Sequence, residues 1–310
     1  MTCKVALFKG GVSAERDVSL ASGTACAKAL REAGYDVTEI DVGKDISLLI
    51  KQLQDLAPAV VFNALHGRWG EDGCVQGLLE LLGIPYTHSG VLSSALAMHK
   101  ERTKTMVSQV GVRVPESKTI QASILAKGDP LPRPYVIKPL SEGSSVGVHI
   151  VFQGDNHVAM TRKELGFDGA IMVERYIPGR ELTVAVMGDK PLAVTELVPK
   201  QGFYSYEAKY TEGKTEHIIP AKVPAEIYEE ALESALKAHQ VLGCSGVSRS
   251  DFRYDDTPEG DGKLYYLETN TQPGMTDLSL VPEQAKYLGM SFPELCAWMV
   301  EDALRSKEES

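Results

Sequence analysis

The first 92 residues alternate short apolar runs with segments of helical periodicity. Residues 4–9 and 59–62 are predicted as buried strands. Residues 18–33 and 47–56 are predicted as helices, because their apolar residues recur with the spacing of one helix face. Strands that alternate with helices in this way indicate a parallel sheet covered by helices. The alternation constrains the chain most strongly, and it predicts an α/β fold that opens with a parallel-sheet domain.

The rest of the chain has a different pattern. Residues 93–111 are predicted as a helix, and short strands separated by glycine turns follow to about residue 200. A second amphipathic helix is expected over 225–242. Two extended runs, 246–254 and 263–269, are joined by a loop rich in Asp, Pro and Gly, which predicts a hairpin. We therefore expect three α/β units, spanning residues 1–92, 93–183 and 184–310.

Composition excludes several classes of protein. A net charge of −10 over 310 residues argues against non-specific nucleic-acid binding, which requires a basic surface. No apolar run reaches the roughly 18 residues of a membrane span. The 5 cysteines form no C-x-x-C pair and are read as reduced thiols. We expect a cytoplasmic protein that binds neither nucleic acid nor membranes.

Two common nucleotide-binding motifs are absent from the sequence. The letters GKT at 213–215 resemble the end of a phosphate-binding loop, but the glycine that this motif needs at position 208 is Ala208. No G-x-G-x-x-G sequence occurs either. The glycine pair in GGVSAERDVSL, residues 10–20, therefore does not by itself predict a phosphate site, and the role of Glu15 stays open at this point.

Polar residues gather on the predicted hairpin. Glu268 and Asn270 are two residues apart on one strand and so share a face, and Asp251 lies on the partner strand. Oxygen donors of this kind suit Mg²⁺, which takes the rest of its shell from water and phosphates. Arg249 shares a face with Asp251 and would add a cation beside such a centre. The alternative is a solvated hairpin edge with no ligand.

A second candidate segment is KPLSEGSSVGV, residues 138–148. Lys138 follows a predicted strand, and small residues at 143–147 would let backbone N–H groups approach phosphate oxygens. Lys100 is a second candidate for a phosphate-binding lysine. Taken singly, these features also describe an ordinary glycine–serine turn and a surface lysine.

Two further segments carry weaker signals. In VERYIPGRELTV, residues 173–184, Tyr176 and Ile177 could wall an adenine ring and Glu181 could accept hydrogen bonds from ribose hydroxyls; the alternative is an exposed turn. The aromatic segment FYSYEAKY, residues 203–210, suits a lid that excludes water from a reaction site, and the alternative there is a surface loop.

Taken together and in order, the motifs NALHGRWGEDG, KPLSEGSSVG, YEAKY, SRSDF and LETNTQPGMT closely resemble those of the D-alanine–D-alanine ligases, which belong to the ATP-grasp superfamily. The resemblance extends from residue 10 to about Leu288. It implies an ATP-grasp fold with three α/β subdomains, and ATP-dependent ligation of two D-alanines through a D-alanyl phosphate, for peptidoglycan precursor synthesis. It also implies a homodimer, and two Mg²⁺ ions, with Mn²⁺ as an alternative.

The resemblance also implies roles for individual residues. For ATP these are Lys100, Lys138, Glu174, Tyr176, Ile177, Glu181, Phe203 and Lys209. For the two metal ions they are Asp251, Glu268 and Asn270. The substrates would be held by Glu15, Val18, His66, Ser279 and Leu280. Catalysis would rest on Glu15, Ser144, Tyr210, Arg249 and the backbone of Gly274.

The sequence departs from the family pattern in places, and rival functions remain. Trp69 and His88 stand where many relatives have glycine, Gln272 where many have serine, and Arg253 where some have an apolar residue. The nearest rival is a D-alanine–D-lactate ligase, and Tyr210 in the lid favours the amine acceptor instead. Another ATP-grasp carboxylate–amine ligase and a non-catalytic ATP-binding module are the remaining alternatives.

Overall fold

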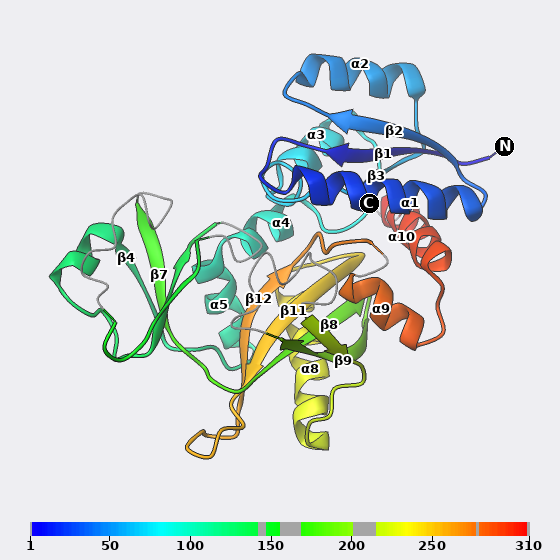
Figure 1. The fold of residues 1–310 in the computed structure, drawn as a ribbon. Coiled ribbons are helices and arrows are strands. Elements are labelled where there is room, and N and C mark those ends of the chain that lie inside the picture. Colours follow the sequence, from blue (N-terminus) through cyan, green and yellow to red (C-terminus); the bar gives the residue numbers. More distant parts are fainter. Residues whose placement is uncertain (1, 142–146, 156–168, 201–214, 277–278, 309–310) are drawn as a thin grey trace.

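A parallel sheet opens the chain in the computed structural model, which describes residues 2–141, 147–155, 169–200, 215–276 and 279–308. Strands β1 (Lys4–Gly10), β2 (Asp36–Val42) and β3 (Val60–Asn63) are arranged in the order β2-β1-β3. Helices α1 (Arg16–Glu32), α2 (Ile46–Leu56) and α3 (Cys74–Leu82) lie against this sheet (Figure 1). The predicted parallel α/β arrangement is confirmed.

Helix α1 lies very close to β1 because its inner face is built from small residues. Ser19, Ser22 and Ala27 are fully buried on that face. A Cβ atom added to Gly23 would lie 2.5 Å from Lys9 Cβ, so only glycine fits at this position. The close packing fixes the start of α1, and with it Glu15, at the carboxyl end of β1.

The predicted helix over 93–111 is wrong in one respect, because the structure has two helices there. Helix α4 (Val91–Met98) and helix α5 (Lys100–Gln109) are separated at His99, whose backbone is extended. The His99 ring accepts a hydrogen bond from the Arg102 N–H and so caps the start of α5. The break makes Lys100 the first residue of α5.

The second sheet is antiparallel and has its own core. Its strands are β4 (Ser117–Gln121), β5 (Tyr135–Pro139), β6 (His149–Val151) and β7 (Ala170–Arg175), in the order β4-β7-β5-β6. A short 3₁₀ helix, η1 (Ala122–Lys127), follows β4. Tyr135, Ile137 and Ile171 are fully buried within this unit.

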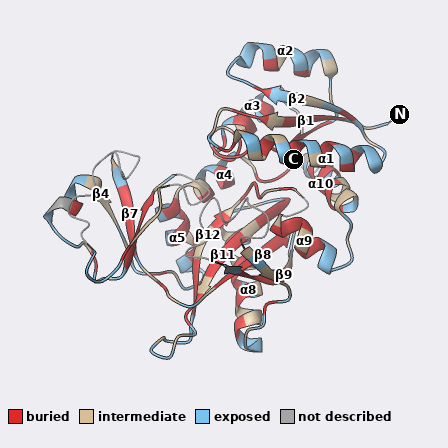
Figure 2. Cartoon of the chain, in the orientation of Figure 1, coloured by how far each residue is buried: buried red, intermediate tan, exposed pale blue. Residues whose placement is uncertain are grey.

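The third sheet is also antiparallel and contains the predicted hairpin. Its strands are β8 (Arg180–Met187), β9 (Lys190–Pro199), β10 (Thr215–Ile218), β11 (Val247–Tyr254) and β12 (Leu264–Asn270), in the order β10-β9-β8-β11-β12. Helix α8 (Ala225–Val241) packs on it through the fully buried Ala231, Ala235 and Ala238. The strands at the centre of the sheet are buried, whereas α8 exposes its outer face (Figure 2). The expected unit boundary after residue 183 falls inside β8.

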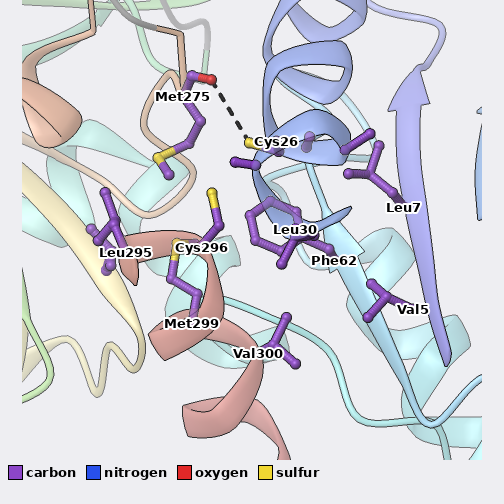
Figure 3. Packing of buried hydrophobic residues seen from close by; sticks show 14 of the residues in the cluster. Val5, Leu7, Cys26, Leu30, Phe62, Met275, Leu295, Cys296, Met299 and Val300 are labelled. Carbon is purple, nitrogen blue, oxygen red and sulfur yellow. Dashed lines mark hydrogen bonds between the residues drawn. The ribbon is translucent and has the colours of Figure 1, made fainter. Parts of the chain in front are cut away.

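The last two helices bring the C-terminal part of the chain back to the N-terminal unit. Helix α9 (Leu280–Tyr287) follows β12, and α10 (Phe292–Glu308) packs against α1. Figure 3 shows Leu30 of α1 facing Cys296 and Met299 of α10. The Cys26 thiol donates a hydrogen bond to the Met275 carbonyl at 3.7 Å. Buried contacts therefore connect the loop after β12 to helix α1 of the N-terminal unit. Within the described residues, no helix is long and apolar enough to cross a bilayer.

Candidate active site

Strands β11 and β12 bring the predicted metal-binding residues together. Asp251 lies directly opposite Glu268, and Arg249 lies opposite Asn270. Asp251 is buried and accepts hydrogen bonds from Arg249 Nε at 2.9 Å and from Thr183 Oγ1 at 2.6 Å. The expected juxtaposition is confirmed, and Arg249 neutralises Asp251 in this structure.

The donor chemistry of this set suits Mg²⁺. Two carboxylates and the Asn270 amide provide oxygen donors, and these are the ligands that the ion prefers. Among the described residues, no three His, Cys, Asp or Glu side chains gather closely enough to hold a metal ion alone. Phosphate and water oxygens would therefore have to complete the shell.

A cluster of buried charges lies where α5 meets the second sheet. The Glu174 carboxylate forms ion pairs with two lysines: Lys104 Nζ lies 2.8 Å from Oε2, and Lys138 Nζ pairs with Oε1. Lys100, at the start of α5, lies 3.4 Å from Glu268. Lysines and carboxylates thus alternate from β7 through α5 to β12.

Electrostatics keep Glu174 ionised. Burial alone would raise its pKa, but the ammonium groups of Lys104 and Lys138 outweigh burial and lower the pKa to about 2. Burial also tends to lower the pKa of Lys138, yet Glu174, Glu268 and Glu181 together raise it. These carboxylates favour the charged form of Lys138, which lies on strand β5, and phosphate binding requires a cation there.

Glu15 lies on the other side of the site, at the N-cap position of α1. Its backbone N–H donates to Ser13 Oγ, whose hydroxyl donates to the His66 carbonyl at 2.7 Å. A Cβ atom on Gly67 would lie 2.9 Å from Glu15 Oε2, and the φ of Gly67 is +65°. Only glycine allows the backbone after His66 to approach the Glu15 carboxylate this closely.

Glu71 completes this side of the site. It is buried and accepts a hydrogen bond from the Gly67 N–H at 2.9 Å. Burial and the nearby carboxylates of Glu15 and Glu268 together raise its pKa to about 8, although the Gly67 N–H and Lys100 act in the opposite direction. These interactions place the N-terminal turn close to the charged residues of α5 and β12.

His66 ties the N-terminal turn to the loop after β12. Its Nδ1 lies 3.1 Å from the Gln272 carbonyl, and its Nε2 lies 3.3 Å from Ser22 Oγ. Ser22 Oγ in turn accepts a hydrogen bond from the Met275 N–H. Burial lowers the pKa of His66 to about 4, so the ring is neutral at pH 7. Val18 lies half-buried one turn after Glu15 on α1.

The start of α9 lies beside this loop. Ser279 is the N-cap residue of α9, and its Oγ accepts a hydrogen bond from the Thr276 N–H at 2.9 Å. A Cβ atom on Gly274 would lie 3.1 Å from Ser279 Oγ. Leu280 begins the helix and is buried. Gly274, Ser279 and Leu280 therefore lie together at a helix N-terminus, which favours anions.

Comparisons with known proteins decide the family. Residues 106–301 match the family described as D-ala D-ala ligase C-terminus, and residues 48–89 match D-ala D-ala ligase N-terminus. A D-alanine–D-alanine ligase of Gluconobacter oxydans is 55% identical over 97% of this chain and 99% of its own length. One from Parvibaculum lavamentivorans is 57% identical over 96% of this chain and 97% of its own length.

This chain belongs to the D-alanine–D-alanine ligase family.

Solved structures of ligases confirm the ATP-grasp α/β fold. A D-alanine–D-alanine ligase from Bacillus anthracis, complexed with ATP, superimposes with a TM-score of 0.83 at 30% identity, and the match covers 99% of both chains. The VanG D-Ala:D-Ser ligase from Enterococcus faecalis gives a TM-score of 0.80 at 31% identity, over 98% of this chain and 100% of that one. The predicted resemblance is confirmed.

The adenine and ribose residues expected from the family lie on the connection from β7 to β8. Tyr176 packs edge-on against Phe152 at 5.7 Å between ring centroids, and Ile177 is buried. Glu181, on β8, lies beside Arg253 of β11, with 3.3 Å between their charged atoms. Four other expected site residues, Ser144, Phe203, Lys209 and Tyr210, lie outside the described residues.

Sequence reasoning missed three residues of the site: Lys104, Glu71 and Arg253. Helix periodicity could have found Lys104, because it lies four residues after Lys100 on the same face of α5. Glu71 belongs to the NALHGRWGEDG motif, in which no local pattern distinguishes this buried carboxylate from the neighbouring Asp72. Arg253 was noted as a departure from the family, but its contacts depend on strand register, which the sequence alone does not provide.

The departures at Trp69 and His88 have a common structural feature. Both residues adopt a positive φ of 72°, the left-handed region that favours glycine. The Trp69 N–H donates to Asp72 at 3.0 Å, and the His88 ring contacts the Val247 carbonyl at 3.3 Å. The third departure, Gln272, exchanges two hydrogen bonds with Asn63 of β3 and so connects two sheets.

Proposed function

We propose that this chain uses ATP to join two D-alanine molecules into D-alanyl-D-alanine for peptidoglycan precursors. The observation that carries the proposal is identity of 55% and 57% to D-alanine–D-alanine ligases over nearly the whole chain. The charged residues that such a reaction requires are brought together between α5, β7 and β12. The units 1–92, 93–183 and 184–310 would carry, in that order, the first D-alanine, part of the ATP site, and the metal ligands.

The first step activates a poor electrophile. The ammonium group of the first D-alanine pairs with Glu15, and a carboxylate oxygen of the same molecule attacks the γ-phosphorus of ATP. ADP leaves and a D-alanyl phosphate forms. Lys138 and Lys100 stabilise the phosphate charge, because their ammonium groups are positively charged. Both lysines lie buried in the site, beside Glu174 and Glu268 respectively.

Asp251, Glu268 and Asn270 would hold two Mg²⁺ ions, with Mn²⁺ as an alternative, since their oxygen donors lie on adjacent positions of paired strands. The ions would supply positive charge to the transferring phosphate. Arg249 now pairs with Asp251, so another partner for Asp251 would release the guanidinium.

The second step is attack on the acyl phosphate by the amine of the second D-alanine. The carbonyl oxygen becomes an oxyanion, which Arg249 and the Gly274 N–H would stabilise. The C–O bond to phosphate then breaks, and the leaving phosphate takes up the proton that the nitrogen loses as the amide forms. Ser279 and Leu280, at the start of α9, would hold the acceptor's carboxylate. His66 is neutral and would position the loop that carries Gly274 rather than bear charge.

The experiment is ADP release by purified protein given ATP, Mg²⁺ and D-alanine. We expect turnover with D-alanine alone and none with L-alanine. D-lactate and D-serine, each added with D-alanine, test other acceptors by product mass. A depsipeptide as the main product near pH 7 would show that the acceptor group is a hydroxyl and not an amine. ATP binding without turnover under all conditions would indicate a non-catalytic module.

We also propose, from family membership, that the protein is a cytoplasmic homodimer. Light scattering after gel filtration tests the dimer. A single species of about twice the 33.7 kDa chain mass is the expected result, and a stable monomer would contradict it.

A further inference from the structure

Arg253 makes an unusual number of contacts with the connection between the second and third sheets. It lies on β11, directly opposite Glu181 of β8. Its Nε donates to the Ile177 carbonyl at 3.0 Å, and its Nη2 donates to the Gly179 carbonyl at 2.8 Å. Its guanidinium also lies 5.9 Å from the centroid of the Tyr176 ring. One side chain therefore contacts four residues of the segment from 176 to 181.

This segment is tightly constrained where Arg253 contacts it. Gly179 has a φ of +88°, and a Cβ atom there would lie 2.2 Å from the Tyr254 carbonyl oxygen. The backbone therefore lies directly on the end of β11. Only 15% of the Arg253 side chain is exposed, so its hydrogen bonds to Ile177 and Glu181 are partly shielded from water, whereas the one to Gly179 is exposed. The planar guanidinium presents five N–H donors in a fixed fork and serves two carbonyls and a carboxylate at once, whereas a lysine carries three donors on a single atom.

The charge on Arg253 also bears on Glu181. Its Nη1 lies 3.3 Å from Glu181 Oε2, and 10% of the Glu181 side chain is exposed. A partly buried carboxylate is a good acceptor for hydroxyl groups only if it stays ionised and holds one orientation. Arg253 favours both conditions.

We propose that Arg253 is a positioning residue for nucleotide recognition: it fixes the 176–181 segment and the Glu181 carboxylate, and thereby sets the discrimination for the ribose hydroxyls of ATP. This inference rests on the proposed function and on the sequence-based expectation that Glu181 accepts hydrogen bonds from the ribose hydroxyls. Arg253 acts through Glu181 and does not touch the reacting atoms.

The test compares kcat/KM for ATP, 2′-deoxy-ATP and 3′-deoxy-ATP in the full-length enzyme with D-alanine and Mg²⁺. Wild type is expected to prefer ATP over at least one deoxy analogue by about tenfold or more, as a hydrogen bond to a charged group provides. In Glu181→Gln that preference falls toward unity. In Arg253→Leu it falls in the same direction, through a higher KM for ATP with kcat largely retained. Arg253→Lys is intermediate.

A double variant tests whether Arg253 acts through Glu181. If Arg253 acts through Glu181, then Arg253→Leu in the Glu181→Gln background changes the preference no further. Arg113→Leu is the matched control. Arg113 also bonds to a backbone carbonyl, that of Leu264 at 3.0 Å, and to a carboxylate, that of Glu230 at 3.1 Å, but it does not contact the 176–181 segment. The Arg113→Leu variant is expected to prefer ATP over the deoxy analogues as strongly as wild type does.

Several outcomes overturn the inference. A normal preference in Arg253→Leu, with a lost preference in Glu181→Gln, leaves ribose recognition with Glu181 and removes Arg253 from it. An equal loss in Arg113→Leu shows general loosening instead of positioning. An unchanged preference in Glu181→Gln rejects the ribose role of Glu181 and with it the inference. The proposed ligase function still holds in that case if wild type turns over ATP with D-alanine. Absence of any turnover in wild type rejects the ligase itself.

Discussion

Lys104 Nζ lies 2.8 Å from Glu174 Oε2, and only 4% and 2% of the two side chains are exposed. The same carboxylate pairs with Lys138, a proposed phosphate-binding residue. Two lysines thus share one buried carboxylate. If Lys138 turns toward a phosphate, Lys104 still compensates Glu174, so no buried charge is left alone. Lys104 therefore has a structural role that makes the phosphate-binding role of Lys138 compatible with burial.

Replacing Lys104 by methionine is expected to destabilise the fold by about 1–3 kcal/mol, because Glu174 would keep Lys138 but lose its other buried partner. Chemical denaturation measures the loss. Lys237→Met is the control: its partner, Glu233, lies four residues away on the exposed face of α8, and we expect a change within about 0.5 kcal/mol. Equal losses in the two variants would contradict the role of Lys104.

Replacing Asp251 by asparagine or Glu268 by glutamine is expected to abolish turnover while the fold is retained. Each substitution removes a charged oxygen from the cross-strand pair proposed to bind Mg²⁺. Steady-state ADP release against Mg²⁺ concentration is the measurement, with circular dichroism as the check on folding. Glu259→Gln, in the exposed loop of the same hairpin, serves as the control. The metal assignment would be abandoned if both site variants turned over like wild type.

The stability of the protein is expected to decrease as pH rises from 6.5 to 8, in part because of Glu71. Burial raises its pKa to about 8, so the folded protein holds a proton that the unfolded chain has released above its ordinary value of 4.5. Unfolding then releases this proton, and the free energy of unfolding falls by at most about 1.4 kcal/mol per pH unit.

Glu71→Gln removes the titrating group and keeps an acceptor for the Gly67 N–H, so a shallower slope of unfolding free energy against pH is expected. Glu32→Gln, at an exposed position of α1, should keep the wild-type slope. Burial also lowers the pKa values of His66 and His88 to about 4. These two rings therefore affect the slope of unfolding free energy against pH only below pH 6.5. Parallel slopes for wild type and Glu71→Gln would show that Glu71 is ionised in the folded protein.

Trp69 offers a test of backbone strain. Its φ of 72° disfavours any residue with a Cβ atom, so Trp69→Gly is expected to be about 1 kcal/mol more stable than Trp69→Ala. The opposite order is expected at the exposed Leu81 of α3, where glycine costs helix stability relative to alanine. Thermal denaturation of the four variants compares the two sites. If alanine were the better residue at both, the left-handed conformation at Trp69 would be wrong.

Local patterns predicted much of this structure. The alternation of strands and helices predicts the parallel sheet, and the hairpin pattern predicts the juxtaposition of Asp251 with Glu268. These features depend on periodicity within a short segment, which the sequence displays directly. The helical pattern continues on both sides of His99, so it does not reveal the break between α4 and α5.

Contacts between distant segments could not be predicted in the same way. The exchange of hydrogen bonds between Asn63 and Gln272 joins residues separated by 209 positions, and its geometry follows from how two sheets pack. Arg253 reaches the 177–179 carbonyls only because β11 and β8 pair in one particular register. The burial of Glu71 likewise depends on the approach of Glu15, Gly67 and Glu268, which no single segment encodes.

The most direct test of the ligase reaction follows an oxygen atom. D-alanine labelled with ¹⁸O in its carboxylate is incubated with the enzyme, ATP and Mg²⁺, and mass spectrometry is applied to the phosphate and the amino-acid products. A D-alanyl phosphate intermediate predicts D-alanyl-D-alanine together with phosphate that carries one ¹⁸O atom per dipeptide formed. Phosphate without label, released with no dipeptide, would contradict the account.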